Sequence, residues 1–182
     1  MTSYARRARF SSEPLARCPP PFNFRPAGEV TSARFVSPPA FASVVPRKRG
    51  ARGQGLRYEA KARAILEHSF RGFFVAQPWV EFTNGDSRPR LCQPDGLLFN
   101  FHRGTIVIVE MKLKHTSDAY FQLTQLYLPV VKKMFPKEGW KIALCEVVRW
   151  YDPSTVFPVV VRMRQHVEDC DPGCIGLHIL KA

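Results

Sequence analysis

Hydrophobic residues recur with two different periods after residue 55, and each period predicts a type of element. Apolar positions at helical spacing predict one helix over residues 56–70 and another over about 118–134. Runs rich in β-branched and aromatic residues predict strands, which fall at 73–82, 91–101, 105–112, 140–150, 156–164 and 176–180. Helix, three strands, helix and further strands is an order typical of an α/β sandwich around a mixed sheet.

Two prolines fall inside predicted elements. Pro78 favours an edge or a bulge in the strand at 73–82, because proline has no N–H group to donate to a neighbouring strand. Pro129 predicts a kink or a break in the helix at 118–134. The remaining turns are predicted from glycine, asparagine and aspartate at 83–89 and from His-Arg-Gly at 102–104.

The first 52 residues show no sustained period and hold many of the prolines, as in PPPF and SPPAF. This predicts an extended N-terminal arm at 1–52 that is rich in Pro and Arg and largely irregular, followed by a folded domain at 53–182. A hydrophobic content of 45% is enough for that domain to form a core. No apolar run of about 18 residues is present, so a membrane span is not predicted.

The net charge of +12 is unevenly distributed, since residues 1–58 hold 11 of the 27 Lys and Arg residues and only two Glu. Such an arm predicts a polyanionic partner, with DNA as the expected one. The expected contacts in the arm are Arg47, Lys48, Arg49 and Arg52. A solvated tail, docking on a protein partner and organelle or nuclear targeting are alternatives. Five scattered cysteines favour a reducing, intracellular compartment.

Residues 93–114 look like two buried strands joined by a turn, yet they carry Asp95, Glu110 and Lys112. Side chains of a strand alternate between its faces, so Glu110 and Lys112 are predicted to point to one face. Asp95 follows Pro94, which restricts the backbone. Pairing across the turn is expected to place Asp95 somewhat beyond the register of Glu110, and whether the two carboxylates converge is left open.

A converging pair of carboxylates favours a hard divalent cation. Two such groups repel each other, and one would take up a proton unless a cation lay between them. Mg²⁺ binds oxygen ligands and keeps several water molecules, which suits phosphate chemistry, and a nearby lysine can orient water or offset phosphate charge. On its own, Asp plus Glu-x-Lys is a weak pattern, and Glu-x-Lys at a strand end more often marks only a solvated terminus.

Pro94-Asp95, then 14 residues, then Glu110-Met111-Lys112 on a hydrophobic strand resembles the PD-(D/E)XK nuclease superfamily. Glu59 on the helix before these strands fits the same order, as does the helix after them. The resemblance covers residues 53–150. It implies a restriction-endonuclease-like core, with a mixed central sheet flanked by helices in the order αβββαβ, and a DNA-hydrolysing enzyme, with endonuclease activity favoured.

The resemblance also implies roles for individual residues. Asp95 and Glu110 would bind Mg²⁺ or Mn²⁺, the Met111 carbonyl and Glu59 would be further ligands, and Lys112 would position the attacking water. Gln122, Gln125 and Lys114 are candidate DNA contacts. The pattern of glutamine followed four residues later by tyrosine, found in exonuclease-type members, is absent because Gln122 precedes Tyr127 by five.

Small phage or recombination and repair nucleases and Holliday-junction resolvases, which usually act as homodimers, are the nearest analogues by size. The competing interpretation is a catalytically inactive nuclease-like module that binds nucleic acid or serves a structural role in a nucleoprotein or virion assembly. A nuclease acting on RNA is a third alternative. The complete set of Asp95, Glu110 and Lys112 favours an active enzyme, because a scaffold has no reason to keep buried charge.

Overall fold

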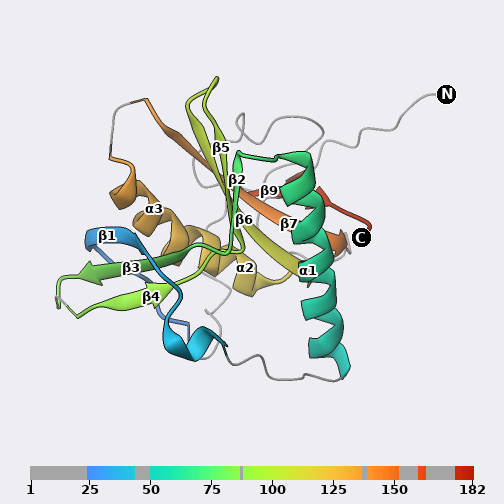
Figure 1. Cartoon of the computed structure of the whole chain (residues 1–182), viewed down its shortest axis with the longest axis horizontal. Coiled ribbons are helices and arrows are strands. Elements are labelled where there is room, and N and C mark those ends of the chain that lie inside the picture. The colour runs from blue at the N-terminus through green and yellow to red at the C-terminus, as the bar shows by residue number, and fades with distance from the viewer. Residues whose placement is uncertain (1–23, 44–49, 87, 137–138, 152–159, 163–174) are drawn as a thin grey trace.

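The computed structural model describes residues 24–43, 50–86, 88–136, 139–151, 160–162 and 175–182, which form an α/β fold with two sheets (Figure 1). The larger sheet is mixed and has the strand order β2-β5-β6-β7-β9-β8. The smaller one has the order β1-β3-β4. None of the described helices is long and apolar enough to cross a bilayer.

The six-stranded sheet is built around β6, whose neighbours run in opposite senses. β5 pairs with β6 antiparallel, whereas β7 pairs with β6 parallel. Beyond them, β2 adds antiparallel to β5, and β9 and β8 add parallel at the other side. The strands are β2 (Phe74–Ala76), β5 (Gly96–Asn100), β6 (Thr105–Lys114), β7 (Lys141–Trp150), β8 (Val160–Arg162) and β9 (Ile175–Ile179).

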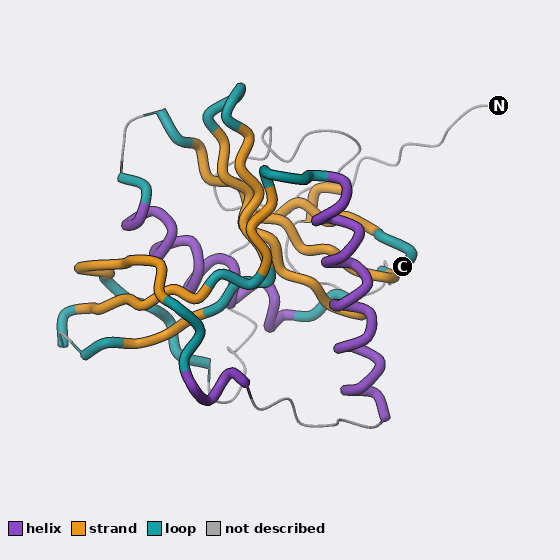
Figure 2. The backbone as a smooth tube through the Cα atoms, in the orientation of Figure 1, coloured by secondary structure: helices purple, strands orange, loops and turns teal. Residues whose placement is uncertain are grey.

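Helices cover both faces of this sheet (Figure 2). α1 (Gly50–Ser69) packs Tyr58 and Ala62 against the face of β6 that carries Val107, Val109 and Met111. The opposite face, with Ile106 and Ile108, packs against a continuous helical segment. That segment consists of α2 (Ser117–Phe121), the π-helix η3 (Gln122–Tyr127) and α3 (Leu128–Met134).

α1 begins earlier than the sequence pattern predicted. The expected start at residue 56 is wrong, because the helix runs through the glycines of the GQG segment from Gly50 onward. Gly53 is buried within it. A glycine in a helix costs about 1 kcal/mol relative to alanine, and packing against the sheet outweighs this cost, as is common for helices in folded proteins.

Two predicted strands are each divided in the structure. The strand expected at 73–82 is split into β2 and β3 (Trp79–Asn84), which belong to different sheets. The break falls at Gln77, whose φ of 44° is left-handed, followed by Pro78, which cannot donate to a ladder. The strand expected at 91–101 is likewise split into β4 (Arg90–Cys92) and β5, and Pro94 lies in the gap.

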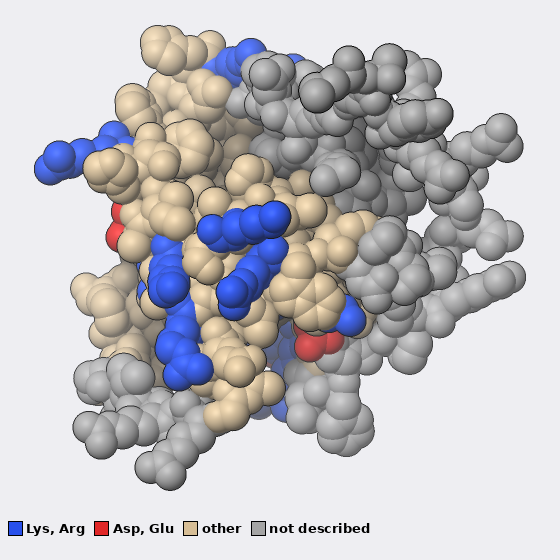
Figure 3. Space-filling model, turned by 90° about the vertical axis from the view of Figure 1, so that its right-hand side faces the viewer, with Lys and Arg blue, Asp and Glu red and all other residues tan. Residues whose placement is uncertain are grey.

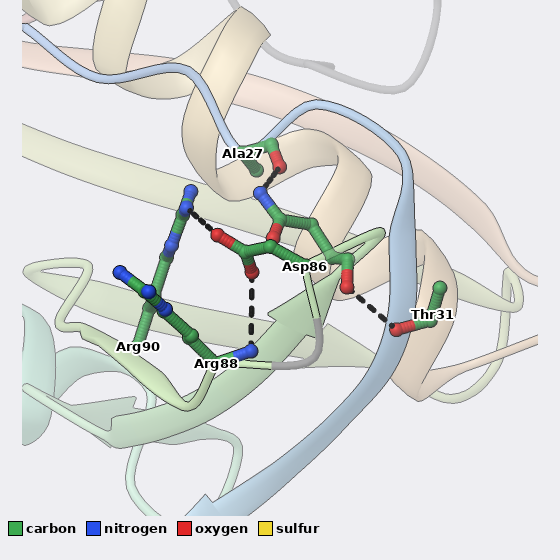
Figure 4. Close-up of polar contacts among 6 residues, drawn as sticks. Ala27, Thr31, Asp86, Arg88 and Arg90 are labelled. Carbon is green, nitrogen blue, oxygen red and sulfur yellow. Dashed lines mark hydrogen bonds and ion pairs between the residues drawn. The ribbon is translucent and has the colours of Figure 1, made fainter.

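The smaller sheet corrects the prediction of an irregular arm, since β1 (Val30–Val36) pairs antiparallel with β3. A 3-10 turn, η2 (Ala40–Ser43), follows it. The turn predicted at 83–89 holds this segment in place (Figure 4). There the Asn84 side chain donates to the Ala27 carbonyl at 3.1 Å, and Asp86 accepts hydrogen bonds from Arg88 and Arg90.

Pro129 disturbs the helix predicted at 118–134. The disturbance takes the form of a π-helix that lies just before the proline. Because Pro129 has no N–H, the carbonyl of Gln125, four residues earlier, loses its helical donor. The backbone N–H of Ala27 takes that place, at 2.9 Å. The proline therefore creates the acceptor that anchors the segment before β1 to the helical layer.

The remaining strand predictions are confirmed where the structure describes the chain. β7 matches the prediction at 140–150, β9 matches the one at 176–180 to within a residue, and β6 extends two residues beyond 112. Of the strand predicted at 156–164, the described part is β8, and the other residues of that range lie outside the described residues.

Candidate active site

The register of the β5–β6 pair places Asp95 beside Glu110. Gly96 is paired with Val109, so the next position along the two chains sets Asp95 opposite Glu110. The backbone N–H of Met111 donates to Asp95 Oδ2 at 2.7 Å. The sequence pattern expected Asp95 to lie somewhat beyond this register, and the structure instead brings the two motifs into direct contact.

Asp95 is held by backbone interactions around the break between β4 and β5. Its carbonyl accepts from the N–H of Gln77 at 3.0 Å, and the Gln93 side chain donates to the Gln77 carbonyl at 3.0 Å. The hydroxyl of Tyr127, from η3, donates to the Gln93 carbonyl at 3.2 Å. The left-handed residue Gln77 and the helical layer therefore both fix the position of the Pro94-Asp95 turn.

Gly96 lies directly against the ring of Phe74, which belongs to β2. A Cβ atom at this position would lie 2.2 Å from Cζ of Phe74, well inside van der Waals contact. A side chain after Asp95 would therefore require the Phe74 ring to move, and the glycine lets β5 begin directly after the carboxylate without that shift.

Glu110 is a buried carboxylate with one close cation. Only 3% of the residue is exposed, and Lys112 Nζ lies 2.5 Å from its Oε1. Burial, and secondarily the charge of Asp95, raises the pKa of Glu110 to about 8, although Lys112 acts in the opposite direction. The fold therefore holds Glu110 in a place where its ionised form is disfavoured unless more positive charge is supplied.

The pKa shifts of the two neighbours follow from the same electrostatics. Burial raises the pKa of Asp95, and the Met111 N–H and the charges of Lys112 and Arg63 offset part of that rise. Burial alone would lower the pKa of Lys112, but the carboxylates, Glu110 foremost, outweigh it and raise that pKa. Lys112 is therefore charged at neutral pH and lies within the field of both carboxylates.

Glu59 belongs to the same electrostatic group from the side of α1. It is partly buried, and its charge acts to raise the pKa values of both Glu110 and Lys112. Among the described residues, no group of three or more His, Cys, Asp and Glu side chains has the arrangement of a metal site. Asp95 and Glu110 are the pair in direct register, and Glu59 has the weakest of the electrostatic effects on Glu110.

The sequence did not indicate Arg63, and it raised Tyr127 only through the absent glutamine–tyrosine pattern and as a possible base-stacking residue. Burial, and then the charges of Glu110 and Asp95, raises the pKa of Tyr127 well above its ordinary value. Arg63 follows Glu59 by four residues, so both lie on one side of α1. Helical spacing from Glu59 was the signal that could have indicated Arg63.

The candidate DNA contacts divide into three groups. Gln122 has a buried Oε1 without a hydrogen-bond partner among the described residues, and it begins the π-helix that ends at Tyr127. Hydrogen bonding from i to i+5 brings residues five apart close together, so a π-helix aligns Gln122 with Tyr127 better than an α-helix would. Gln125 is exposed, and Lys114 Nζ lies 4.8 Å from the centroid of the Trp150 ring.

The candidate contacts in the arm have a separate outcome. Arg52 is exposed in the first turns of α1. Arg47, Lys48 and Arg49 lie outside the described residues.

A second buried polar pair lies beside Glu110. Glu146 on β7 is paired with Glu110 in the parallel register, and its carboxylate forms a short hydrogen bond with His115 Nδ1. The backbone N–H of Thr116 also reaches Glu146 Oε1, at 3.4 Å. The sequence pattern did not indicate this pair, because its partners are 31 residues apart.

The hairpin end that carries the turn has an aromatic cluster instead, beside the exposed His102 and Arg103. Phe99 and Phe101 are stacked, with ring centroids 6.0 Å apart, and both contact Trp140 edge-on. A pocket at this end has no titratable group in its lining, which consists of Gly72, Val75, Phe99, Phe101, Met134, Phe135, Pro136 and Trp140. The buried and partly buried ionisable residues of the hairpin therefore lie at the end that carries Asp95 and Glu110, whereas His102 and Arg103 in the turn are exposed.

Comparisons of this chain with family models, with curated proteins and with solved structures found no match. Its function is therefore inferred from its own residues and their geometry.

Proposed function

We propose that this protein is a metal-dependent nuclease that hydrolyses DNA phosphodiester bonds at the site formed by Asp95, Glu110 and Lys112. The observation that carries the proposal is the contact between the two strand motifs, with Asp95 bonded to the Met111 N–H and Glu110 bonded to Lys112. Two adjacent, largely buried carboxylates are unfavourable when both are ionised. A bound divalent cation removes that penalty.

The residues present fit Mg²⁺ or Mn²⁺. Asp95 and Glu110 would supply carboxylate oxygens. The N–H and C=O of one residue point to the same side of a strand, so the Met111 carbonyl also faces the side of Asp95 and would be a further ligand. Glu59 would bind through water. Mg²⁺ usually keeps several waters and needs only one or two carboxylates, and when bound it supplies Lewis acidity and an acidified water.

Lys112 has the role that depends least on the metal. Its charge persists at neutral pH, because the surrounding carboxylates raise its pKa. About a quarter of its side chain is exposed, so the ammonium group lies between the buried Glu110 and solvent. From this position it would orient the attacking water and stabilise the negative charge that develops on the phosphate.

The arrangement of elements supports a restriction-endonuclease-like core. The order α1, β2, β5, β6, α2, β7 corresponds to αβββαβ when β3 and β4 are counted with the smaller sheet. The net charge of +12 supports a polyanionic substrate. DNA is the substrate that these features favour, with internal cleavage as the favoured mode.

The test is a cleavage assay on purified wild-type protein. Supercoiled plasmid, linear duplex, single-stranded DNA, a four-way junction and RNA would each be incubated with Mg²⁺, with Mn²⁺ and with EDTA. We expect nicking of plasmid in either metal and none in EDTA. Cleavage that is unchanged by EDTA would contradict the proposal. A folded protein that cleaves none of these substrates would favour the inactive nuclease-like module.

A further inference from the structure

The helix α1 has two polar edges that differ in their surroundings. Tyr58 and Ala62 define its buried side. Helical geometry puts Glu59 and Arg63 on one flank of that side and the exposed pair Arg57 and Lys61 on the other. Figure 3 shows the side of the molecule that carries α1, where Lys and Arg side chains gather with few acidic ones visible between them.

Arg63 is the unusual member of this cationic surface. It is partly buried, and its Nε is buried without a hydrogen-bond partner among the described residues. Its charge also acts on Asp95, which places it within electrostatic range of the candidate site. A buried donor without an acceptor is costly, so turning the Arg63 side chain toward a ligand that supplies an acceptor would remove that cost.

The chemistry of that ligand follows from the guanidinium group. Its donors form a planar fork that fits the oxygens of a phosphate, and such charge-assisted bonds are stronger than neutral ones. An anion is the ligand that satisfies this fork. The carboxylates already on this side of the helix belong to the protein itself and are not a bound ligand. Under the proposed function, the anion that must come next to Asp95 is a phosphodiester.

We propose that Arg63 binds a backbone phosphate of the nucleic acid beside the Asp95–Glu110 site, so that the substrate lies along the Glu59 flank of α1. This inference rests on the proposed function for the identity of the ligand. The flank that carries Arg57 and Lys61 makes no specific contact in this proposal. It contributes only to the general positive field.

The experiment measures binding separately from cleavage. Fluorescence anisotropy of a labelled DNA duplex would be recorded with Ca²⁺ in place of Mg²⁺, at several salt concentrations, for wild type, Arg63→Gln and Arg57→Gln. Arg57→Gln is the matched control, because it removes the same charge from the other flank of the same helix. For Arg63→Gln we expect affinity to fall about tenfold and the salt dependence to lose about one phosphate contact.

The outcomes separate this inference from the proposed function. Equal weakening by the two variants, or a wild type that does not bind the duplex, overturns the assignment of Arg63 even if the protein cleaves DNA. Binding that depends on Arg63 supports it even if no cleavage is found. Circular dichroism melts show whether Arg63→Gln folds.

If Arg63→Gln does not fold, Arg63→Lys replaces it, because it keeps the charge beside Asp95 and loses only the fork. We then expect affinity for the duplex to fall a few-fold. Unchanged affinity of a folded Arg63→Lys would overturn the proposal.

Discussion

Glu110 and Glu146 occupy the same position on adjacent parallel strands, and the fold treats them differently. They are in register between β6 and β7, and both are buried. The basic partner of Glu110 is Lys112, on β6. The basic partner of Glu146 is His115, the residue that follows β6. What differs is how the protein satisfies each carboxylate.

The Glu146–His115 pair is fully enclosed, with side-chain exposures of 0% and 1%. Both carboxylate oxygens of Glu146 have protein donors, namely His115 and the N–H of Thr116. Glu110 instead has a second carboxylate beside it and a partner that is 25% exposed. The carboxylate of Glu146 is thus satisfied by protein donors, although Nε2 of His115 is buried without a hydrogen-bond partner among the described residues. Glu110 is left in an environment that, under the proposed function, a bound cation would complete.

The largest expected difference is in stability. Glu146→Leu leaves the His115 imidazole buried without its acceptor, so we expect the free energy of unfolding to fall by about 3–5 kcal/mol. Glu110→Leu removes a carboxylate whose ionised form is already disfavoured, and Lys112 can reach solvent, so we expect a change within about 1 kcal/mol at pH 8. Urea unfolding of both variants measures the difference.

A double variant serves as the control for this comparison. Adding His115→Leu to Glu146→Leu removes the unpaired imidazole and should restore part of the lost stability. Equal losses in the two single variants would mean that Glu110 is as much a structural group as Glu146, and the contrast between the pairs would not hold.

The next effect concerns cleavage. Asp95→Asn removes a carboxylate from the candidate metal site, and we expect the rate of plasmid nicking to fall on the order of 100-fold or more. Asp86→Asn is the matched control, since Asp86 lies in the exposed turn of Figure 4, where it is paired with Arg90. Similar rates for Asp95→Asn and Asp86→Asn would remove Asp95 from the site.

A smaller effect links pH to metal binding. The pKa of Glu110 is about 8 in the folded protein and 4.5 ordinarily, so between these values the folded state keeps a proton that the unfolded chain has released. Stability should therefore fall as pH rises from about 5 to 8, and Asp95, whose pKa is also raised, adds to the same trend. We expect the free energy of unfolding to fall by about 1–3 kcal/mol over this pH range. In Glu110→Gln this dependence on pH should be flatter.

Metal ions should act on this dependence, because a cation competes with the proton at Glu110. We expect Mn²⁺ to raise the melting temperature more at pH 8 than at pH 5 in wild type, and to have little effect in Glu110→Gln. Calorimetric scans at the two pH values measure this. A Mn²⁺ effect that is the same at both would show that the ion binds elsewhere.

Local pattern was enough to predict the elements that hold the site. The β-branched run at 105–112 and the period of 2 placed Glu110 and Lys112 correctly on one strand, which became β6. The breaks at Gln77 and in the Pro94 turn depend on a left-handed residue and on contacts between distant segments. The sequence therefore indicated these breaks only through the prolines in them.

Long-range partners were beyond the reach of the sequence. Pairing of β1 with β3, the Ala27 to Gln125 bond and the Glu146–His115 pair each join residues far apart in the chain. No spacing rule connects such residues. For Arg63, helical spacing from Glu59 could indicate its side of α1, but its buried Nε without a partner among the described residues is a property of packing.

The most direct test of the central claim is single-turnover nicking of supercoiled plasmid by wild type and Lys112→Ala, in the same concentration of Mg²⁺. Lys112 is the residue whose role in the chemistry is separate from binding the metal, and unfolding curves would confirm that both proteins are folded. We expect metal-dependent nicking by wild type and a rate at least about 100-fold lower for Lys112→Ala. Equal nicking by the two proteins would contradict the assignment of this site as catalytic.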